Sequence, residues 1–380
     1  MNTRTRALLA AALVLGVAAG PLAAPAGARE PAAASRAHIG PDAAALAGLP
    51  DDDATAALVR VGGTGGSWRG SAGVHDLRSG RPADPAGRFR AGSVTKVFTA
   101  AVVLQLAGEG KVDLDGYVRD YLPDLIPAAY GKVKVRQLLD HTHGMPGADV
   151  PGKDVHDWYA HRFDVRDPRA TVASATAKER VAPPGEVQRY GNIGYTVAGL
   201  LIERVSGDRY ENQVARRILR PLGLRGTYFP GASPRIRGPH NHGYQVFPLA
   251  DGASELRDVT VWGVTEAWAA GDLVSTTADL ERFLLALFRG EVVRGPLLKE
   301  MFTVPAGVPG ATMSAGLQRY EAEDGRVLWL KTGGRWGYNT MIAATGDLSR
   351  TLVYSVNSTD AKGLEGNPVA ERITRAAFAR

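Results

Sequence analysis

The sequence has 380 residues, of which 44% are hydrophobic and 22% are charged, as in ordinary globular proteins. This composition excludes an intrinsically disordered chain, which would contain fewer apolar residues and a larger charge imbalance than the net +6. The chain has no cysteine, which excludes a disulfide framework, a thiolate nucleophile and a cysteine-ligated metal. Its basic residues are scattered and form no long run, so the positive charge indicates a solvated surface and no nucleic-acid partner.

Residues 1–28 have the pattern of a secretory signal peptide. Two arginines precede the uncharged apolar run 7–19, and a small-residue cleavage site ends at Ala28. The run is shorter than the roughly 20 residues that span a bilayer, which argues against a transmembrane anchor. We therefore expect a secreted, extracellular chain without stable membrane insertion, with a tether rich in Ala, Pro and Gly over 29–50.

Hydrophobic periodicity places strands at both ends of the catalytic domain expected over 51–380, with helices between them. The first strong helix covers 93–107. Strands at the two ends predict an α/β lobe built from 51–92 and 305–380, a helical lobe over 93–304, and a ligand-binding cleft between them. The predicted strands are 56–61, 71–77, 313–320, 326–331, 340–344 and 351–356, and the other main helices are 195–205, 276–288 (with Thr277 as N-cap) and 368–379.

A serine and a lysine stand three residues apart at the start of the first helix, as Ser93 and Lys96. Positions three apart share one face of a helix, so the hydroxyl and the amine can touch. A serine hydroxyl becomes a good nucleophile when a neighbouring base takes its proton, and a lysine is such a base when burial or a second cation lowers its pKa. The spacing indicates nucleophilic catalysis with Lys96 as proton acceptor.

A second motif, Lys331-Thr332-Gly333, ends a predicted strand and is followed by Gly334. A strand edge at this point can pair with a substrate backbone, and the two glycines permit close approach. Lys331 would supply the second cation that lowers the pKa of Lys96.

A third motif, Tyr190-Gly191-Asn192, lies in a polar loop before a predicted helix. A phenol can relay protons, and an amide can bind both a substrate carbonyl and a lysine. Similar triplets at 210–212 and 355–357 fall inside a predicted helix and a predicted strand, so Tyr190 is the better candidate.

The motifs occur in a fixed order, and together they resemble the serine β-lactamase and penicillin-binding-protein superfamily, in particular class C β-lactamases and secreted D-Ala-D-Ala carboxypeptidases. The resemblance extends from about residue 56 to 379. It implies a β-lactamase/transpeptidase-like α/β (α+β) fold with an antiparallel sheet lobe flanked by helices and an all-helical lobe. The motifs that carry it are FRAGSVTK (89–96), LLDHTHGMP (138–146), YGN (190–192), AGDLVS (270–275) and KTG (331–333).

The resemblance also implies a role for each catalytic residue. Ser93 is acylated, Lys96 and Tyr190 share proton transfer, and Asn192 holds the acyl side chain of the substrate. The backbone N–H groups of Ser93 and Gly334 form the oxyanion hole. No cofactor and no metal is expected.

The substrate-binding residues that the resemblance implies are Lys331 and Thr332, placed near the carboxylate of the substrate. The secreted carboxypeptidases carry His-Thr-Gly at this motif and an arginine on the preceding strand. This chain has Lys331 in the motif and Gln318 on that strand, with Arg319 beside it. Neighbouring strand residues face opposite sides, so Arg319 does not automatically replace that arginine. Arg335, just after Gly334, is a second candidate for binding the carboxylate.

Two His-x-His pairs, 141/143 and 240/242, lack the acidic neighbours of a metal site. His141 is expected to order a loop.

The sequence predicts a secreted serine hydrolase that forms an acyl-enzyme on Ser93. The first hypothesis is that the chain is a D-alanyl-D-alanine carboxypeptidase or related D-peptidase that recognises penicillin. A class C-like β-lactamase or esterase is an alternative, and a β-lactam-binding sensor with little turnover is an alternative of another class. We expect a monomer whose partner is a small-molecule or peptide substrate.

Overall fold

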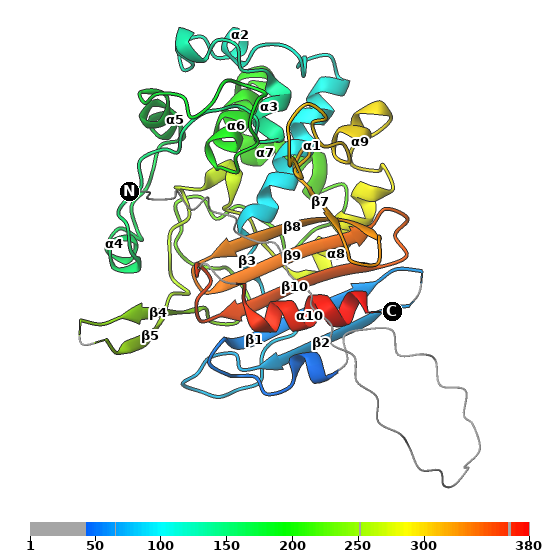
Figure 1. The fold of residues 1–380 in the computed structure, drawn as a ribbon. Helices are drawn as coiled ribbons and strands as arrows, with labels where there is room; N and C mark the ends of the chain where they lie inside the picture. Colours follow the sequence, from blue (N-terminus) through cyan, green and yellow to red (C-terminus); the bar gives the residue numbers. More distant parts are fainter. Residues whose placement is uncertain (1–42, 65, 251, 364–365, 380) are drawn as a thin grey trace, which may run out of the picture.

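The computed structural model describes residues 43–379 apart from 65, 251, 364 and 365 (Figure 1). The predicted signal peptide and residues 29–42 of the predicted tether lie outside the described residues. The 3-10 helix η1 (Ala43–Leu46) shows that folded structure begins inside the segment predicted as a tether, because Leu46 is buried against the sheet lobe. Within the described part, no helix has the length and apolar character to cross a membrane.

A six-stranded antiparallel sheet forms the α/β lobe, with strand order β2-β1-β10-β9-β8-β7. Strand β1 (Ala54–Gly62) pairs with β10 (Thr351–Ser358), so the two ends of the domain meet in the middle of the sheet. The sheet is thus assembled from both ends of the described chain. The other strands are β2 (Trp68–Gly73), β7 (Gln318–Glu321), β8 (Val327–Arg335) and β9 (Tyr338–Thr345).

All six predicted strands have other bounds in the structure, and β8 continues through the Lys331-Thr332-Gly333 motif to Arg335 instead of ending there. At β2 and β7 a glycine explains the difference. Strand β2 ends at Gly73, whose φ of +84° turns the chain out of the sheet. Strand β7 begins only at Gln318, because Ser314 donates its backbone N–H to Leu317 O in a turn at Gly316.

Helices cover both faces of the sheet. Helix α10 (Pro368–Phe378) lies across one face, where Val369 and Ile373 pack against inward side chains of the strands (Figure 1). Helix α8 (Thr277–Phe288) packs on the opposite face, although the sequence assigned it to the helical lobe. Its N-cap is Thr276, not the predicted Thr277, since the Thr276 side chain accepts the Asp279 N–H.

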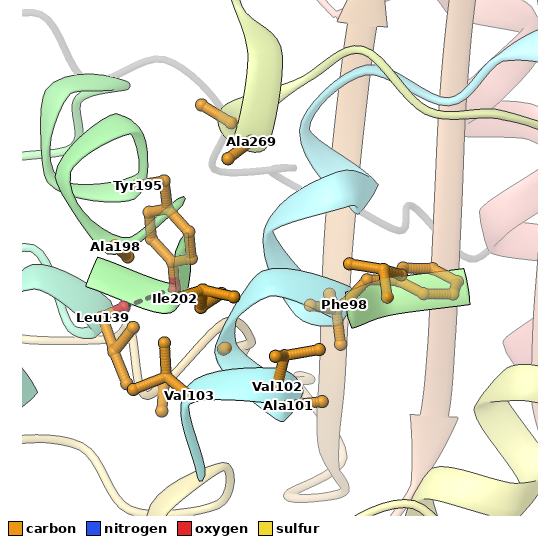
Figure 2. Packing of buried hydrophobic residues seen from close by; sticks show 14 of the residues in the cluster. Phe98, Ala101, Val102, Val103, Leu139, Tyr195, Ala198, Ile202 and Ala269 are labelled. Carbon is orange, nitrogen blue, oxygen red and sulfur yellow. Dashed lines mark hydrogen bonds between the residues drawn. The ribbon is translucent and has the colours of Figure 1, made fainter. Parts of the chain in front are cut away.

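The helical lobe is built around α1 (Thr95–Gly108) and α6 (Ile193–Ser206), which pack together (Figure 2). Helix α1 is buried around nearly its whole circumference, as expected for a helix that is apolar on all sides. This burial holds the start of α1 in a fixed position. The shorter helices are α2 (Val118–Tyr121), η3 (Ala128–Tyr130), α3 (Val135–Leu139), α4 (Val155–Ala160), α5 (Pro168–Thr176), α7 (Tyr210–Val214), η4 (Ala215–Leu219) and α9 (Pro296–Glu300).

Segment 93–304 also contains strands. A hairpin of β4 (Tyr244–Pro248) and β5 (Ser254–Asp258) projects beside the sheet (Figure 1). Strand β6 (Val274–Ser275) pairs with β3 (Phe89–Arg90), just before the predicted nucleophile. This small sheet ties the residues around 270 to the start of α1.

Candidate active site

Ser93 lies in a short 3-10 turn, η2 (Gly92–Val94), that leads directly into α1. Gly92 has a φ of +53°, a left-handed conformation that favours glycine. A Cβ at Gly92 would also lie 2.8 Å from the backbone N of Gly334. Backbone geometry thus brings the predicted nucleophile against strand β8, whose Gly334 stands 241 positions later in the chain.

Lys96 is fully buried, and its ammonium contacts three oxygens. Its Nζ donates to Ser93 Oγ at 3.1 Å, to Asn192 Oδ1 at 2.8 Å and to the carbonyl of Ala270 at 2.7 Å. Burial is the main cause that lowers the pKa of Lys96 to about 8; Lys331 lowers it further, and Tyr190 opposes the shift. Three acceptors match the three donors of a charged ammonium.

Tyr190 brings a second titratable group to the nucleophile. Its hydroxyl lies 2.7 Å from Ser93 Oγ, although 45% of the tyrosine surface is exposed. Removal of the hydroxyl from water alone would raise the pKa of Tyr190. The positive charges of Lys331 and Lys96 outweigh that cost and lower the pKa to about 7.

The loop that carries Tyr190 is fixed by His141. The His141 carbonyl accepts the N–H of Arg189, and its Nδ1 accepts the N–H of Gly191 at 3.4 Å. Its ring packs 4.6 Å from the Tyr190 ring, centroid to centroid. Burial is the main cause that lowers the pKa of His141 well below its usual value, so the ring is neutral and Nδ1 can accept. His141 therefore orders a loop, as the sequence predicted.

Strand β8 forms the other wall of the site. Lys331 is buried, and its Nζ lies 4.8 Å from the centroid of the Tyr190 ring. Gly333 packs so closely that a Cβ there would lie 2.0 Å from Ala91 O and 3.0 Å from Ser93 N. The backbones of Ser93 and Gly334 are thus neighbours, the arrangement that the oxyanion-hole prediction requires.

The structure places Arg335 in a buried ion pair with Glu266, so its charge is already matched by a carboxylate. Arg319 pairs with Glu321 on β7, the strand at one edge of the sheet. Neither arginine stands as an isolated cation for a substrate. Thr332 accepts the Lys331 ammonium through its carbonyl, and the binding role of its side chain stays a prediction.

Sequence reasoning missed one functional group, the carbonyl of Ala270. The segment 270–275 forms part of a sequence motif, but residue type alone does not show which backbone carbonyl accepts a hydrogen bond. The similar triplets at 210–212 and 355–357 lie outside the site. The Tyr210 hydroxyl contacts Thr99 in the core, and Asn357 Nδ2 donates to the His242 carbonyl. In the described part of the chain, no three His or acidic side chains gather as a metal site would require.

The geometry around Ser93 bears on which of the two residues predicted to share proton transfer would act as the base. Because Lys96 donates to three acceptors, it is arranged as a charged donor, whereas a proton acceptor needs an open lone pair. Tyr190 lies nearer to Ser93 Oγ and has a pKa of about 7, close to the pH at which a general base works best. This arrangement favours Tyr190 as the base and Lys96 as the cation beside it, and the roles of both residues stay predictions.

Comparison with known proteins gives the same result for the fold and the family. The family model described as Beta-lactamase matches residues 43–375. Penicillin-binding protein 4* from Bacillus subtilis is 27% identical over 298 residues, which are 76% of this chain and 64% of that protein. The chain thus spans less than two thirds of the length of this curated relative.

Two solved structures are similar over nearly their whole length. A D-stereospecific amidohydrolase from Streptomyces sp. has a TM-score of 0.76 and 30% identity, covering 88% of this chain and 97% of the other. The D-amino acid amidase from Ochrobactrum anthropi SV3 has a TM-score of 0.72 and 25% identity, covering 85% and 93%. The antiparallel sheet, the residues clustered around Ser93 and these matches together place the chain in the Beta-lactamase family, among its serine hydrolases related to penicillin-binding proteins and D-amino acid amidases.

Proposed function

We propose that this chain hydrolyses amide bonds that follow a D-amino acid, as a D-Ala-D-Ala carboxypeptidase or a related D-peptidase, through an acyl-enzyme on Ser93. The observation that carries the proposal is the contact of Ser93 Oγ with both the Tyr190 hydroxyl and the Lys96 ammonium. D-stereospecificity and amide cleavage are supported by the names of the two structural neighbours. Carboxypeptidase activity is the more specific claim within this proposal.

Acylation begins when the Tyr190 phenolate takes the Ser93 proton and Oγ attacks the scissile carbonyl carbon. The carbonyl electron pair moves to its oxygen, which the N–H groups of Ser93 and Gly334 stabilise. The intermediate then collapses, the carbon–nitrogen bond breaks, and the leaving amine takes the proton back from Tyr190. A water molecule repeats the sequence on the ester, releasing the acid and restoring Ser93.

The choice between peptidase and amidase depends on what binds a carboxylate on the leaving group. Both candidate arginines already pair with a glutamate, as Arg335 with Glu266 and Arg319 with Glu321. Lys331 is then the cation nearest Tyr190 that can receive a C-terminal carboxylate. A lysine is a point charge without the bidentate fork of arginine, which favours a broader range of leaving groups.

Penicillin recognition is a second proposal, supported by the penicillin-binding relative. A β-lactam carries a strained amide beside a carboxylate and would acylate the same serine. Slow attack by water would make the chain a penicillin-binding enzyme, and rapid attack would make it a β-lactamase.

The decisive experiment combines product release with intact-protein mass spectrometry. The purified chain is given D- and L-alanine p-nitroanilide, a D-Ala-D-Ala peptide and benzylpenicillin, beside S93A as control. Release of p-nitroaniline from the D substrate alone, together with release of D-Ala, would support the D-peptidase proposal. Release from the D-anilide without D-Ala would support an amidase, and equal D and L rates would reject D-specificity.

We also propose that the chain is secreted and monomeric, on the evidence of residues 1–28 alone for secretion. Expression with export intact should give a product that starts at Arg29 in the culture medium. A full-length chain retained in the cell would reject this.

A further inference from the structure

We propose that Lys362 binds a carboxylate on the acyl side of the substrate, which would make it a specificity-determining residue. This inference rests on the proposed function, because it concerns the substrate of the same Ser93 site. Lys362 lies in the loop between β10 and α10, and no sequence motif includes it.

The loop brings the Lys362 ammonium to the edge of the predicted oxyanion hole. Its Nζ donates to Gly334 O at 3.0 Å. Gly334 also provides the backbone N–H predicted to bind the oxyanion, so the ammonium contacts the same residue that is expected to lie beside the reacting carbonyl. Lys362 is the residue that occupies this backbone acceptor in the described structure.

Direction along β8 places Lys362 on the acyl side. Lys331 and Gly334 are three residues apart on the strand, or about 10 Å. The leaving amine takes its proton from Tyr190, which lies beside Lys331. The leaving group therefore faces Lys331, and the acyl substituent faces the opposite way, toward Gly334 O and Lys362.

The loop around Lys362 is held by its neighbours on the sheet. The Ala361 N–H donates to Gln245 Oε1, and the Ala361 carbonyl accepts the Asn339 side chain. Gln245 Nε2 also donates to Asp360 Oδ1 at 2.8 Å. These contacts fix the backbone immediately before the lysine.

The charges around Lys362 favour an anion. Arg335 and Lys96 are the positive charges that act on Lys362, and Glu266 is the carboxylate paired with Arg335. The side chain reaches solvent, but partial removal of its ammonium from water and the nearby Arg335 lower the pKa of Lys362 to about 8, which leaves most of the ammonium charged at neutral pH. An ammonium has three donors, so the bond to Gly334 O can persist while a carboxylate binds.

The test uses two esters that differ in one carboxylate, the p-nitrophenyl esters of N-succinyl-D-alanine and N-butanoyl-D-alanine. The activated ester reports acylation without demanding a particular leaving group. We expect the wild-type chain to prefer the succinyl ester by about tenfold in kcat/KM, the effect of a charge-assisted hydrogen bond. K362M should bring this ratio close to one, and K362R should retain much of the preference.

K111M is the matched control, because Lys111 follows the far end of α1, about 20 Å from Ser93 along the helix. It should keep the wild-type ratio. Equal rates on both esters in the wild-type chain, or a K362M variant that loses both rates in parallel, would overturn the role of Lys362 and leave the serine hydrolase intact. Hydrolysis of neither ester would reject the proposed function and Lys362 with it.

Discussion

The two sides of the site differ in how the chain holds its charged groups. On the catalytic side, Ser93 and Lys96 come from one turn of chain, and the lysine ammonium contacts three oxygens. On the acyl side, Arg335, Glu266 and Lys362 come from three distant segments, and the lysine remains exposed toward solvent. The difference teaches that local helical spacing places the nucleophile beside Lys96, while the fold alone brings Tyr190 to them and joins the groups proposed to select the substrate.

The largest expected effect belongs to the nucleophile. S93A should abolish covalent labelling by benzylpenicillin and lower kcat/KM on any substrate by about 10⁴-fold or more, because no acyl-enzyme can form. Intact-protein mass spectrometry gives the labelling directly. S71A, on the exposed strand β2, serves as control and should label normally. An adduct that persists in S93A would place the nucleophile elsewhere.

The next effect tests whether Tyr190 is the base. Y190F removes the phenol that lies 2.7 Å from Ser93 Oγ, and we expect kcat to fall by about 10²–10⁴-fold. In the wild-type chain the rate should rise with pH through about 7, as Tyr190 becomes a phenolate. If Lys96 were the base, the residual rate of Y190F would be high and would rise through a pH below about 8, because the phenol that raises the Lys96 pKa is gone. The exposed Tyr117 gives a matched control, Y117F, with an unchanged profile.

A third variant tests the contact between strand β8 and the turn that carries Ser93. G333A introduces a methyl group 2.0 Å from Ala91 O, a backbone atom that cannot rotate away. The strand or the Ser93 turn must shift, which should cost about 1–3 kcal/mol of the free energy of unfolding and lower activity by about 10–100-fold. G346A is the matched control, since a methyl there meets open space. Thermal unfolding and the rate are measured together, and an unchanged rate would show that this contact does not position Ser93.

Much of the catalytic side could be predicted from the sequence because its residues obey short-range rules. Ser93 and Lys96 have helical spacing, and Tyr190 stands in a Pro- and Gly-rich loop. The strands near both ends of the domain show either alternating apolar and polar residues or a continuous apolar run. The bounds of β2 and β7 could not be predicted, since single glycines decide where those strands turn. The role of the Ala270 carbonyl as an acceptor for Lys96 could not be predicted, because every residue type has a backbone carbonyl.

The acyl side could not be predicted because its contacts join residues far apart in sequence. Arg335 was predicted as a partner of a substrate carboxylate, yet the fold gives it Glu266 as a buried partner, 69 positions away. Lys362 lies in a loop without motif or periodicity. Its importance arises only from the position of Gly334 O, which is set by the pairing of β8 with β9.

The smallest expected effect lies where the two sides meet, at Lys331. Its positive charge lowers the pKa of Tyr190 and of Lys96, so K331M should raise both pKa values. A raised pKa means that the phenolate forms only at higher pH, and the acidic limb of the kcat/KM profile should move upward by about one pH unit. The plateau rate at high pH should fall less than in Y190F, because the base is still present. K331R should return the limb to its original position if charge alone matters. A limb that stays in place in K331M would show that Lys331 only binds substrate, and the catalytic and binding sides would then be electrostatically independent.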